Sequence, residues 1–295
     1  MGYTSGKGSI DLDKVLGYEF QPMTSQYDEK DASLYALAIG AAADAVDVDE
    51  LKFVYEISTK FQTIPLFAVT FISETLMRIL DIDGLDFNPM MLLHGEHYLE
   101  IKRPLPPKSA LHHHAQIVDV FDKGKGALLI IEVRTAGYDG RDLALNRLSI
   151  FIRGLTGFGG ERGAANEYIL PDRAPDGVIT EKTAVNQALQ YRLASGDRNP
   201  LHADPAMAAL GGFDRPILHG LCTYGYAGRA VLKQYGGNDG EKFKSINGRF
   251  SKHVFPGETI TTEMWQESPT RILFQSKAAE RDVVVLSNGI VELNN

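Results

Sequence analysis

Eight stretches of this chain of 295 residues alternate apolar with polar positions, and they fall into two groups of four. Alternation of this kind is typical of antiparallel strands with one buried face. The predicted strands lie near residues 92–102, 111–121, 126–138, 142–152, 243–254, 259–267, 271–280 and 283–292. Two segments that look helical precede each group, at residues 29–43 and 66–80 and at residues 183–194 and 220–235. The pattern therefore predicts an α+β fold built from two similar halves.

The two halves also share residues. The run YALAIGA at residues 35–41 matches YRLASGD at residues 191–197 at its Tyr, Leu, Ala and Gly positions. Ala41 then stands where Asp197 stands in the second run. An order of elements that occurs twice indicates an internal repeat. We therefore expect a duplication in which only the second half retains chemistry.

A stretch rich in Gly and Pro separates the two halves and is typical of a linker. It divides the chain into a first repeat at residues 1–153, a linker at residues 154–177 and a second repeat at residues 178–295. Inside the linker, GFGGER at residues 157–162 imitates a dinucleotide-binding loop. We discard that interpretation because Arg162 stands where the third glycine would have to be.

The densest group of reactive side chains is the hexapeptide DRNPLH at residues 197–202. It follows a predicted helix that stops at Gly196, and its proline prevents the helix from continuing. An acid/base pair that shares one water molecule needs both groups held on such a constrained loop. Plain turn chemistry is the alternative, because Asp, Asn and Pro are common turn residues.

Five blocks of the sequence resemble the hydratase 2 family, the R-specific enoyl-CoA hydratases related to MaoC-like dehydratases. They are LHGEHYLEI at 93–101, DKGKG at 122–126, GFGG at 157–160, YRLASGDRNPLHADP at 191–205 and GFDRPILHGLCTYG at 212–225. The resemblance spans nearly the whole chain and is closest to the hydratase 2 unit of peroxisomal multifunctional enzymes of type 2. It implies a double hot-dog fold, in which each repeat wraps an antiparallel sheet around a long helix.

The resemblance implies reversible syn hydration of trans-2-enoyl-CoA to (3R)-hydroxyacyl-CoA in fatty-acid β-oxidation. The second repeat would carry the catalytic motif, and a degenerate first repeat would bind the acyl chain. Asp197 and His202 would activate the water, and Asn199 would hold the water or a partner side chain by its amide. Which of Asp197 and His202 is the base stays open, because two interacting groups titrate as a coupled system.

A further group is needed for the negative charge that develops on the thioester oxygen. Gly220 opens the predicted helix at 220–235, where free N–H groups and the helix dipole favour negative charge. We expect its N–H to be the oxyanion donor, and an ordinary loop glycine is the alternative. The resemblance also assigns acyl-CoA contacts. The residues that would make these contacts are His94, Gly95, Lys123 and Phe250. Lys123 could instead be a solvated hairpin lysine.

Composition limits the partners. The net charge of −8 argues against nucleic acid, and no run has the apolar length of a membrane span. Cys222 is the single cysteine, and its apolar surroundings indicate a buried thiol. His112, His113 and His114 lack a spaced carboxylate, so we expect no metal. We expect no cofactor apart from the coenzyme A that the substrate carries.

Relatives form dimers, so the resemblance implies a homodimer, and it implies a peroxisomal location. The last residues, VELNN, are not a Ser-Lys-Leu signal, which leaves a cytoplasmic location open. Two other functions remain alternatives. Hot-dog folds also host acyl-CoA thioesterases, against which the string DxNPxH argues, and acyl-CoA-binding proteins without activity. The latter would be expected to lose Asp197 or His202, and this chain has both.

Overall fold

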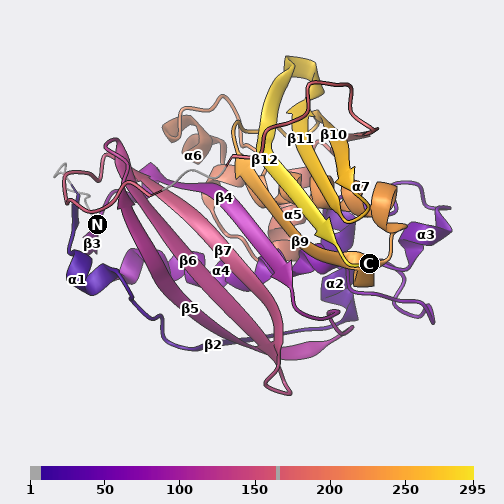
Figure 1. Ribbon diagram of the computed structural model, residues 1–295, viewed down its shortest axis with the longest axis horizontal. Coiled ribbons are helices and arrows are strands. Elements are labelled where there is room, and N and C mark those ends of the chain that lie inside the picture. The colour runs from indigo at the N-terminus through magenta and orange to yellow at the C-terminus, as the bar shows by residue number, and fades with distance from the viewer. Residues whose placement is uncertain (1–7, 164–166) are drawn as a thin grey trace.

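One antiparallel sheet of ten strands runs through the whole molecule in the computed structural model, which describes residues 8–163 and 167–295 (Figure 1). The strand order is β2-β5-β6-β7-β4-β9-β12-β11-β10-β8. The first five strands belong to the first half of the chain, and the last five repeat their order in mirror image. The two halves therefore join edge to edge through the β4–β9 pair.

The strands agree with the alternation in the sequence. They are β2 (Met23–Tyr27), β4 (Leu92–Ile101), β5 (Ser109–Asp122), β6 (Gly126–Gly137), β7 (Asp142–Arg153), β8 (Gly177–Lys182), β9 (Phe243–Phe250), β10 (Thr259–Ser268), β11 (Arg271–Ala278) and β12 (Val283–Leu293). A separate small sheet pairs β1 (Ser9–Ile10) with β3 (Leu85–Asp86). All eight predicted strands are present. The pattern missed β2 and β8, the short edge strands that open each half.

The helices lie on one side of the sheet or at its ends. The α-helices are α1 (Leu12–Val15), α2 (Glu29–Ala38), α3 (Val48–Leu51), α4 (Ser73–Arg78), α5 (Gln187–Ser195), α6 (Pro205–Leu210) and α7 (Gly220–Gly236). The 3₁₀ turns are η1 (Pro65–Ile72), η2 (Ile79–Asp81), η3 (Pro89–Met91), η4 (Pro200–His202), η5 (Gly240–Lys242) and η6 (Ala279–Arg281). The long α7 packs on β9 to β12 and is the central helix of the second half.

The double hot-dog prediction is confirmed, with one difference in the first half. The predicted helix at 66–80 is not continuous there: η1 is a 3₁₀ helix, and only α4 after it is α-helical. Pro65 starts η1, and the β-branched and aromatic side chains that follow, such as Val69 and Phe71, have low helix propensity. Almost every side chain of η1 is buried, so packing stabilises this 3₁₀ geometry.

Two other helices are shorter than the sequence predicts. The helix predicted at 29–43 ends at Ala38 because Gly40 takes a left-handed conformation with φ +83°. The helix predicted at 183–194 begins only at Gln187. Its matched glycine, Gly196, is left-handed too, with φ +73°.

The two runs of the predicted repeat meet in space. The rings of Tyr35 on α2 and Tyr191 on α5 lie 5.9 Å apart, centroid to centroid. Both are fully buried in the largest of three core clusters among the described residues, which contains side chains from both halves. The halves thus share a core as well as a sheet.

Gly225 and Gly228 of α7 allow a close approach, mainly by residues of the first half. A Cβ on Gly225 would lie 2.5 Å from Ile39 Cγ2, and one on Gly228 would lie 2.6 Å from Leu66 Cδ2. Among the nearest atoms to these two Cβ positions, the sheet contributes Ile246 of β9, 3.2 Å from the one on Gly228.

The chain between the halves crosses the second-half sheet. Residues 164–166 of the predicted linker lie outside the described residues, and Gly177 at its end already belongs to β8. Tyr168 and Leu170 pack against Trp265, whose Nε1 donates to the Arg173 carbonyl at 2.9 Å. The linker is therefore packed against the sheet along part of its length.

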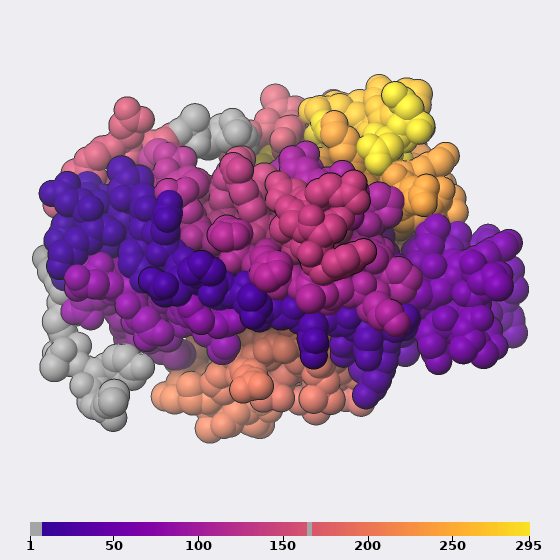
Figure 2. All heavy atoms as spheres, turned by 90° about the horizontal axis from the view of Figure 1, so that it is seen from below, coloured from indigo at the N-terminus to yellow at the C-terminus, as the bar shows by residue number. Residues whose placement is uncertain are grey.

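In the space-filling view the N-terminal residues cover one side of the first half, and the purple segment that contains α3 projects at one end (Figure 2). Within residues 8–163 and 167–295, no helix has the length and apolar character needed to cross a membrane.

Gly228→Ala tests the shared core. Helix propensity alone would favour alanine by about 1 kcal/mol. The clash with the fully buried Leu66 should outweigh this and lower the free energy of unfolding by about 1–3 kcal/mol, measured by urea denaturation. In a Leu66→Ala background the same change should cost much less. A more stable Gly228→Ala protein would show that the contact is not tight.

Candidate functional site

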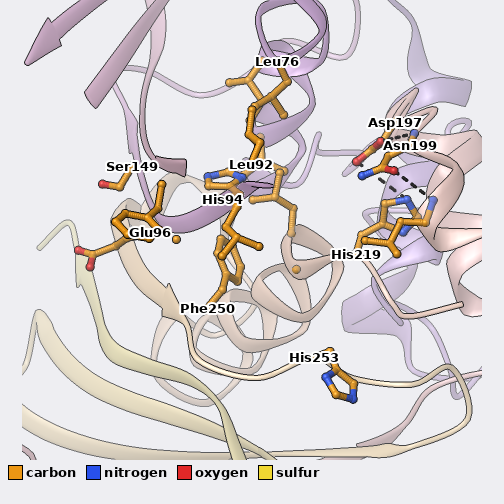
Figure 3. A pocket seen from close by; sticks show the side chains of 18 of the residues that line it. Leu76, Leu92, His94, Glu96, Ser149, Asp197, Asn199, His219, Phe250 and His253 are labelled. Atoms are coloured by element: carbon orange, nitrogen blue, oxygen red, sulfur yellow. Dashed lines mark hydrogen bonds and ion pairs between the residues drawn. The ribbon is translucent and has the colours of Figure 1, made fainter. Parts of the chain in front are cut away.

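A large cavity of about 1940 Å³ lies where the two halves meet. Leu76, Leu92 and His94 from the first half face Asp197 and His219 of the second half across it (Figure 3). The lining continues over the other face of the first-half sheet, since it includes Leu128 and Ile130, which alternate with core residues along β6. The cavity exceeds the 300–1,000 Å³ of ordinary ligand pockets. It therefore has room for a ligand larger than an ordinary metabolite.

The hexapeptide at 197–202 forms a compact loop between α5 and α6. Asp197 Oδ1 accepts from the Asn199 N–H at 2.9 Å, and Asn199 Oδ1 accepts from the Leu201 N–H at 3.1 Å. The second bond caps η4, with Pro200 at its first position. Turn chemistry is thus present, and it also fixes the Asp197 carboxylate at the cavity wall.

His202 is buried at the end of this loop, and its ring orientation is fixed. Its Nδ1 lies 2.9 Å from the Ile217 carbonyl oxygen. A carbonyl only accepts hydrogen bonds, so Nδ1 carries the proton and Nε2 keeps its lone pair in the neutral ring. Burial lowers the pKa of His202, and the charge of Asp197 partly opposes this. Near neutral pH, His202 is therefore an uncharged acceptor at Nε2.

His219 lies directly against this pair. Its ring stacks on the His202 ring with 3.8 Å between centroids, and its Nε2 lies 4.0 Å from Asp197 Oδ2. Only 2 % of the residue is exposed, and within the described part of the chain neither ring nitrogen has a hydrogen-bond partner. Burial and the neighbouring His202 lower its pKa to about 2, so the ring is neutral.

Asp197, His202 and His219 are also the group most suited to a metal ion, since each offers one ligand atom and these atoms lie within 4.8 Å of one another. The ring planes of the two histidines, however, differ by only 29°. A nitrogen lone pair lies in the plane of its ring, so two stacked rings do not aim at one ion. The arrangement fits an acid/base group better than a metal centre.

Gly220 is the first residue of α7, so no carbonyl within the helix accepts its N–H. It lines the cavity together with Asp197 and His202, and its backbone is exposed. Phe250 packs closely against it, because a Cβ on Gly220 would lie 2.9 Å from Phe250 Cδ1. The site thus places a helix N-terminus next to the two polar side chains, as the sequence predicts.

His94 lines the cavity from β4, where its ring lies 5.1 Å from that of Phe250. A buried chain of polar groups supports it. His94 Nε2 is 3.3 Å from His97 Nδ1, and His97 Nε2 is 3.0 Å from Asn146 Oδ1. Asn146 Nδ2 in turn donates to the Ala68 carbonyl at 3.1 Å. Burial lowers the pKa of His94 to about 4, so the ring is neutral.

Gly95 and Lys123 line the same cavity. Gly95 lies in a bulge of β4, where the pairing with β7 shifts between His94 and Glu96. Lys123 Nζ donates to the Gly163 carbonyl at 3.2 Å and lies 5.4 Å from the Phe121 ring centroid. An anionic ligand would therefore compete with an intramolecular bond for Lys123.

His113 and Cys222 have structural places, and Cys222 is buried as the sequence indicated. Both ring nitrogens of His113 are occupied, by Ser25 Oγ at 2.8 Å and Thr135 Oγ1 at 2.9 Å, while His112 and His114 are exposed. Cys222 is buried, and its Sγ donates to the Ala38 carbonyl at 3.4 Å.

Of the side chains that meet at Asp197 and His202, the sequence analysis did not single out His219. It stands in the block at 212–225, immediately before Gly220, and this adjacency was the available signal. Its contact with Asp197 depends on two loops that only the fold brings together.

Comparison with known proteins shows the family of the chain. Residues 25–154 match the MFE-2 hydratase 2 N-terminal domain, and residues 167–288 match the MaoC-like domain. The chain is 46% identical to a probable enoyl-CoA hydratase 2 of Dictyostelium discoideum, over 96% of each protein. It is 43% identical to the peroxisomal enoyl-CoA hydratase 2 of Arabidopsis thaliana, over 95% of this chain and 94% of that protein.

A solved structure shows the same fold. The MaoC-like dehydratase of Phytophthora capsici superimposes with a TM-score of 0.87 at 38% sequence identity, over 97% of this chain and 98% of that one. Together the two domain matches and the full-length relatives show that this chain belongs to the enoyl-CoA hydratase 2 family of MaoC-like proteins.

Proposed function

We propose that this protein is a hydro-lyase that adds water reversibly to trans-2-enoyl-CoA and gives (3R)-hydroxyacyl-CoA in β-oxidation. Its full-length relatives are enoyl-CoA hydratases 2. The observation that carries the mechanism is the Asp197–His202 pair at the wall of a large cavity, beside the N-terminus of α7.

The spacing of the pair suits one shared water molecule. A carboxylate oxygen of Asp197 and a ring nitrogen of His202 lie within 4.8 Å. At or below this separation, one water oxygen about 2.8 Å from each atom can bridge them. Its own hydrogen bonds would then orient its lone pair toward the substrate.

In hydration the water oxygen bonds to C3 and one O–H bond of the water breaks. The proton from that bond passes to His202 or Asp197, and the same group then delivers it to C2, while the other group holds the water. Both groups stand on the same wall, so oxygen and proton would reach the same face of the double bond. This supports syn addition.

The electron pair of the double bond moves toward the thioester oxygen while C3–O bond formation proceeds. We assign the Gly220 N–H as the donor that stabilises this oxygen, because it is free within α7 and lies at the positive end of the helix dipole. Asn199 Oδ1 caps η4, so the Nδ2 of this side chain is available to hold the water or the substrate.

The first half supplies the apolar wall for the acyl chain, in keeping with a repeat that lacks the acid/base residues. Leu76, Met77, Leu80 and Leu92 line the cavity on that side, with His94, Gly95 and Phe250 next to the reacting carbons. Lys123 would contact a CoA phosphate after leaving the Gly163 carbonyl. We also propose that the protein is peroxisomal, like the enoyl-CoA hydratase 2 of Arabidopsis thaliana, and that it forms a homodimer.

Purified protein with trans-2-decenoyl-CoA should lose the absorbance of the conjugated enoyl thioester and form (3R)-hydroxydecanoyl-CoA. Asp197→Asn and His202→Gln should each lower kcat by about 10²- to 10⁴-fold, because each removes one proton-transfer group. Kinetics with chiral analysis of the product measures both effects.

Asp204→Asn is the matched control. Asp204 belongs to the same sequence block, but it caps α6 at the Ala206 N–H (2.8 Å) and asparagine caps equally well. Its activity should stay near that of the unaltered protein. Release of free CoA would instead indicate a thioesterase, and no turnover at any chain length would indicate a binding protein.

The pH profile should reflect the buried state of His202. A lowered pKa means that the ring takes up its proton only below the ordinary histidine value of about 6.5. kcat/KM for hydration should therefore stay level from pH 8 down to about 6.5 and fall only at more acid pH. A fall in kcat/KM centred above pH 6.5 would contradict an uncharged acceptor at His202.

Gly220→Ala should act mainly on kcat. The added Cβ would lie 2.9 Å from Phe250 Cδ1 and move either the ring or the helix start, which displaces the oxyanion donor. Loss of one such donor lowers kcat by about 10²- to 10³-fold. Steady-state kinetics should show that fall with a much smaller change in KM, and an unchanged kcat would remove Gly220 from the mechanism.

A further inference from the structure

We propose that His219 is a positioning residue for hydration, which holds Asp197 by a hydrogen bond and His202 by ring stacking. The inference rests on the proposed function, because it assigns His219 a task within that reaction. Three features of the side chain carry it: its unpartnered nitrogens, its two neighbours and its place before Gly220.

The first feature is an imidazole in a place that suits a hydrocarbon ring. His219 is 2 % exposed, and in the part of the chain that the structure describes both ring nitrogens lack a partner. Burying unpaired polar groups is unfavourable, whereas phenylalanine would fill a similar space without that cost. Stability alone does not account for histidine here, and unsatisfied groups of this kind are typical of functional sites.

The second feature is the direction of the ring. His219 Nε2 lies 4.0 Å from Asp197 Oδ2, the oxygen opposite the one that the Asn199 N–H already holds. A neutral ring protonated at Nε2 presents a donor to this carboxylate. The distance is too long for a hydrogen bond, and a small rotation of either side chain would close it. Catalytic hydrogen bonds commonly tighten when substrate binds.

Stacking provides the other contact. The His219 ring covers one face of His202 at 3.8 Å, while the Ile217 carbonyl holds His202 Nδ1. The His202 ring is thus fixed both in its plane and perpendicular to it. His202 Nε2 then has a single direction, which is what a group sharing a water molecule with Asp197 requires.

The third feature links the pair to the oxyanion donor. His219 is the N-cap of α7, and its carbonyl accepts from the Cys222 N–H at 3.1 Å and the Thr223 N–H at 3.3 Å. Its backbone is therefore fixed to the same helix end as Gly220. The side chain of His219 contacts the acid/base pair, and its backbone is bonded directly to Gly220. His219 therefore fixes the pair relative to the Gly220 N–H.

Two substitutions separate the contacts. His219→Phe keeps a ring that can stack on His202 and removes the donor, whereas His219→Gln keeps a donor near the Nε2 position. With trans-2-decenoyl-CoA, kcat of His219→Phe should fall about 10- to 100-fold, the range for losing a hydrogen bond to a charged group. KM should change by less than about threefold, since the bond forms with the reacting state. His219→Gln should keep more of kcat than His219→Phe.

Tyr35→Phe is the matched control. Tyr35 is another fully buried residue whose polar atom has no partner among the described residues, and it packs on Tyr191, which also contacts the His219 ring. It touches neither Asp197 nor His202 through any hydrogen bond or ring contact, so its kcat should equal that of the unaltered enzyme. Thermal unfolding of all three variants shows whether each remains folded at the assay temperature.

The outcomes distinguish this inference from the proposed function. If the unaltered protein does not hydrate enoyl-CoA, the proposed function fails first. If it does, and Asp197→Asn is inactive while folded His219→Phe has full kcat, only the role of His219 is overturned. Equal losses of kcat in His219→Phe and His219→Gln would overturn the hydrogen bond to Asp197. A lower kcat in folded Tyr35→Phe would show that any change in this buried cluster lowers kcat, which would overturn a specific role of His219.

Discussion

The hydrogen bond between His202 Nδ1 and the Ile217 carbonyl is the constraint on which the site depends. It joins the loop after α5 to the segment that leads into α7, fifteen residues further along the chain. The same bond fixes the protonated nitrogen, so that His202 offers a lone pair at Nε2. Burial keeps the ring uncharged. One contact thus determines the position, the tautomer and the charge of the group that shares water with Asp197.

The two halves are copies that have since diverged, and this divergence explains why the reactive loop is found in the second half and not in the first. The strand order of the first half is repeated in the second, and Gly40 and Gly196 end matched helices in the same left-handed conformation. Ala41 follows the first glycine and is buried, while Asp197 follows the second and lines the cavity. The first half thus contributes apolar walls, and the second half contributes the reactive groups.

Sequence alone predicted most of the fold, because alternation over eight or more residues defines a half-buried strand. It failed where local signals were weak. The short edge strands β2 and β8 have few residues to show a pattern, and η1 has a helical spacing that buried β-branched and aromatic side chains turn into a 3₁₀ helix. The site residues were visible because they cluster in short blocks. The role of His219 was not, since stacking on His202 is a tertiary contact between two loops.

Hydration in deuterium oxide tests the central claim most directly. A single water held by Asp197 and His202 on one wall should deliver oxygen to C3 and deuterium to C2 from the same face. NMR of the (3R)-hydroxyacyl product should show deuterium at C2 in the syn position only. Anti addition, or a mixture of both, would contradict a shared water and would place the proton donor on another wall of the cavity.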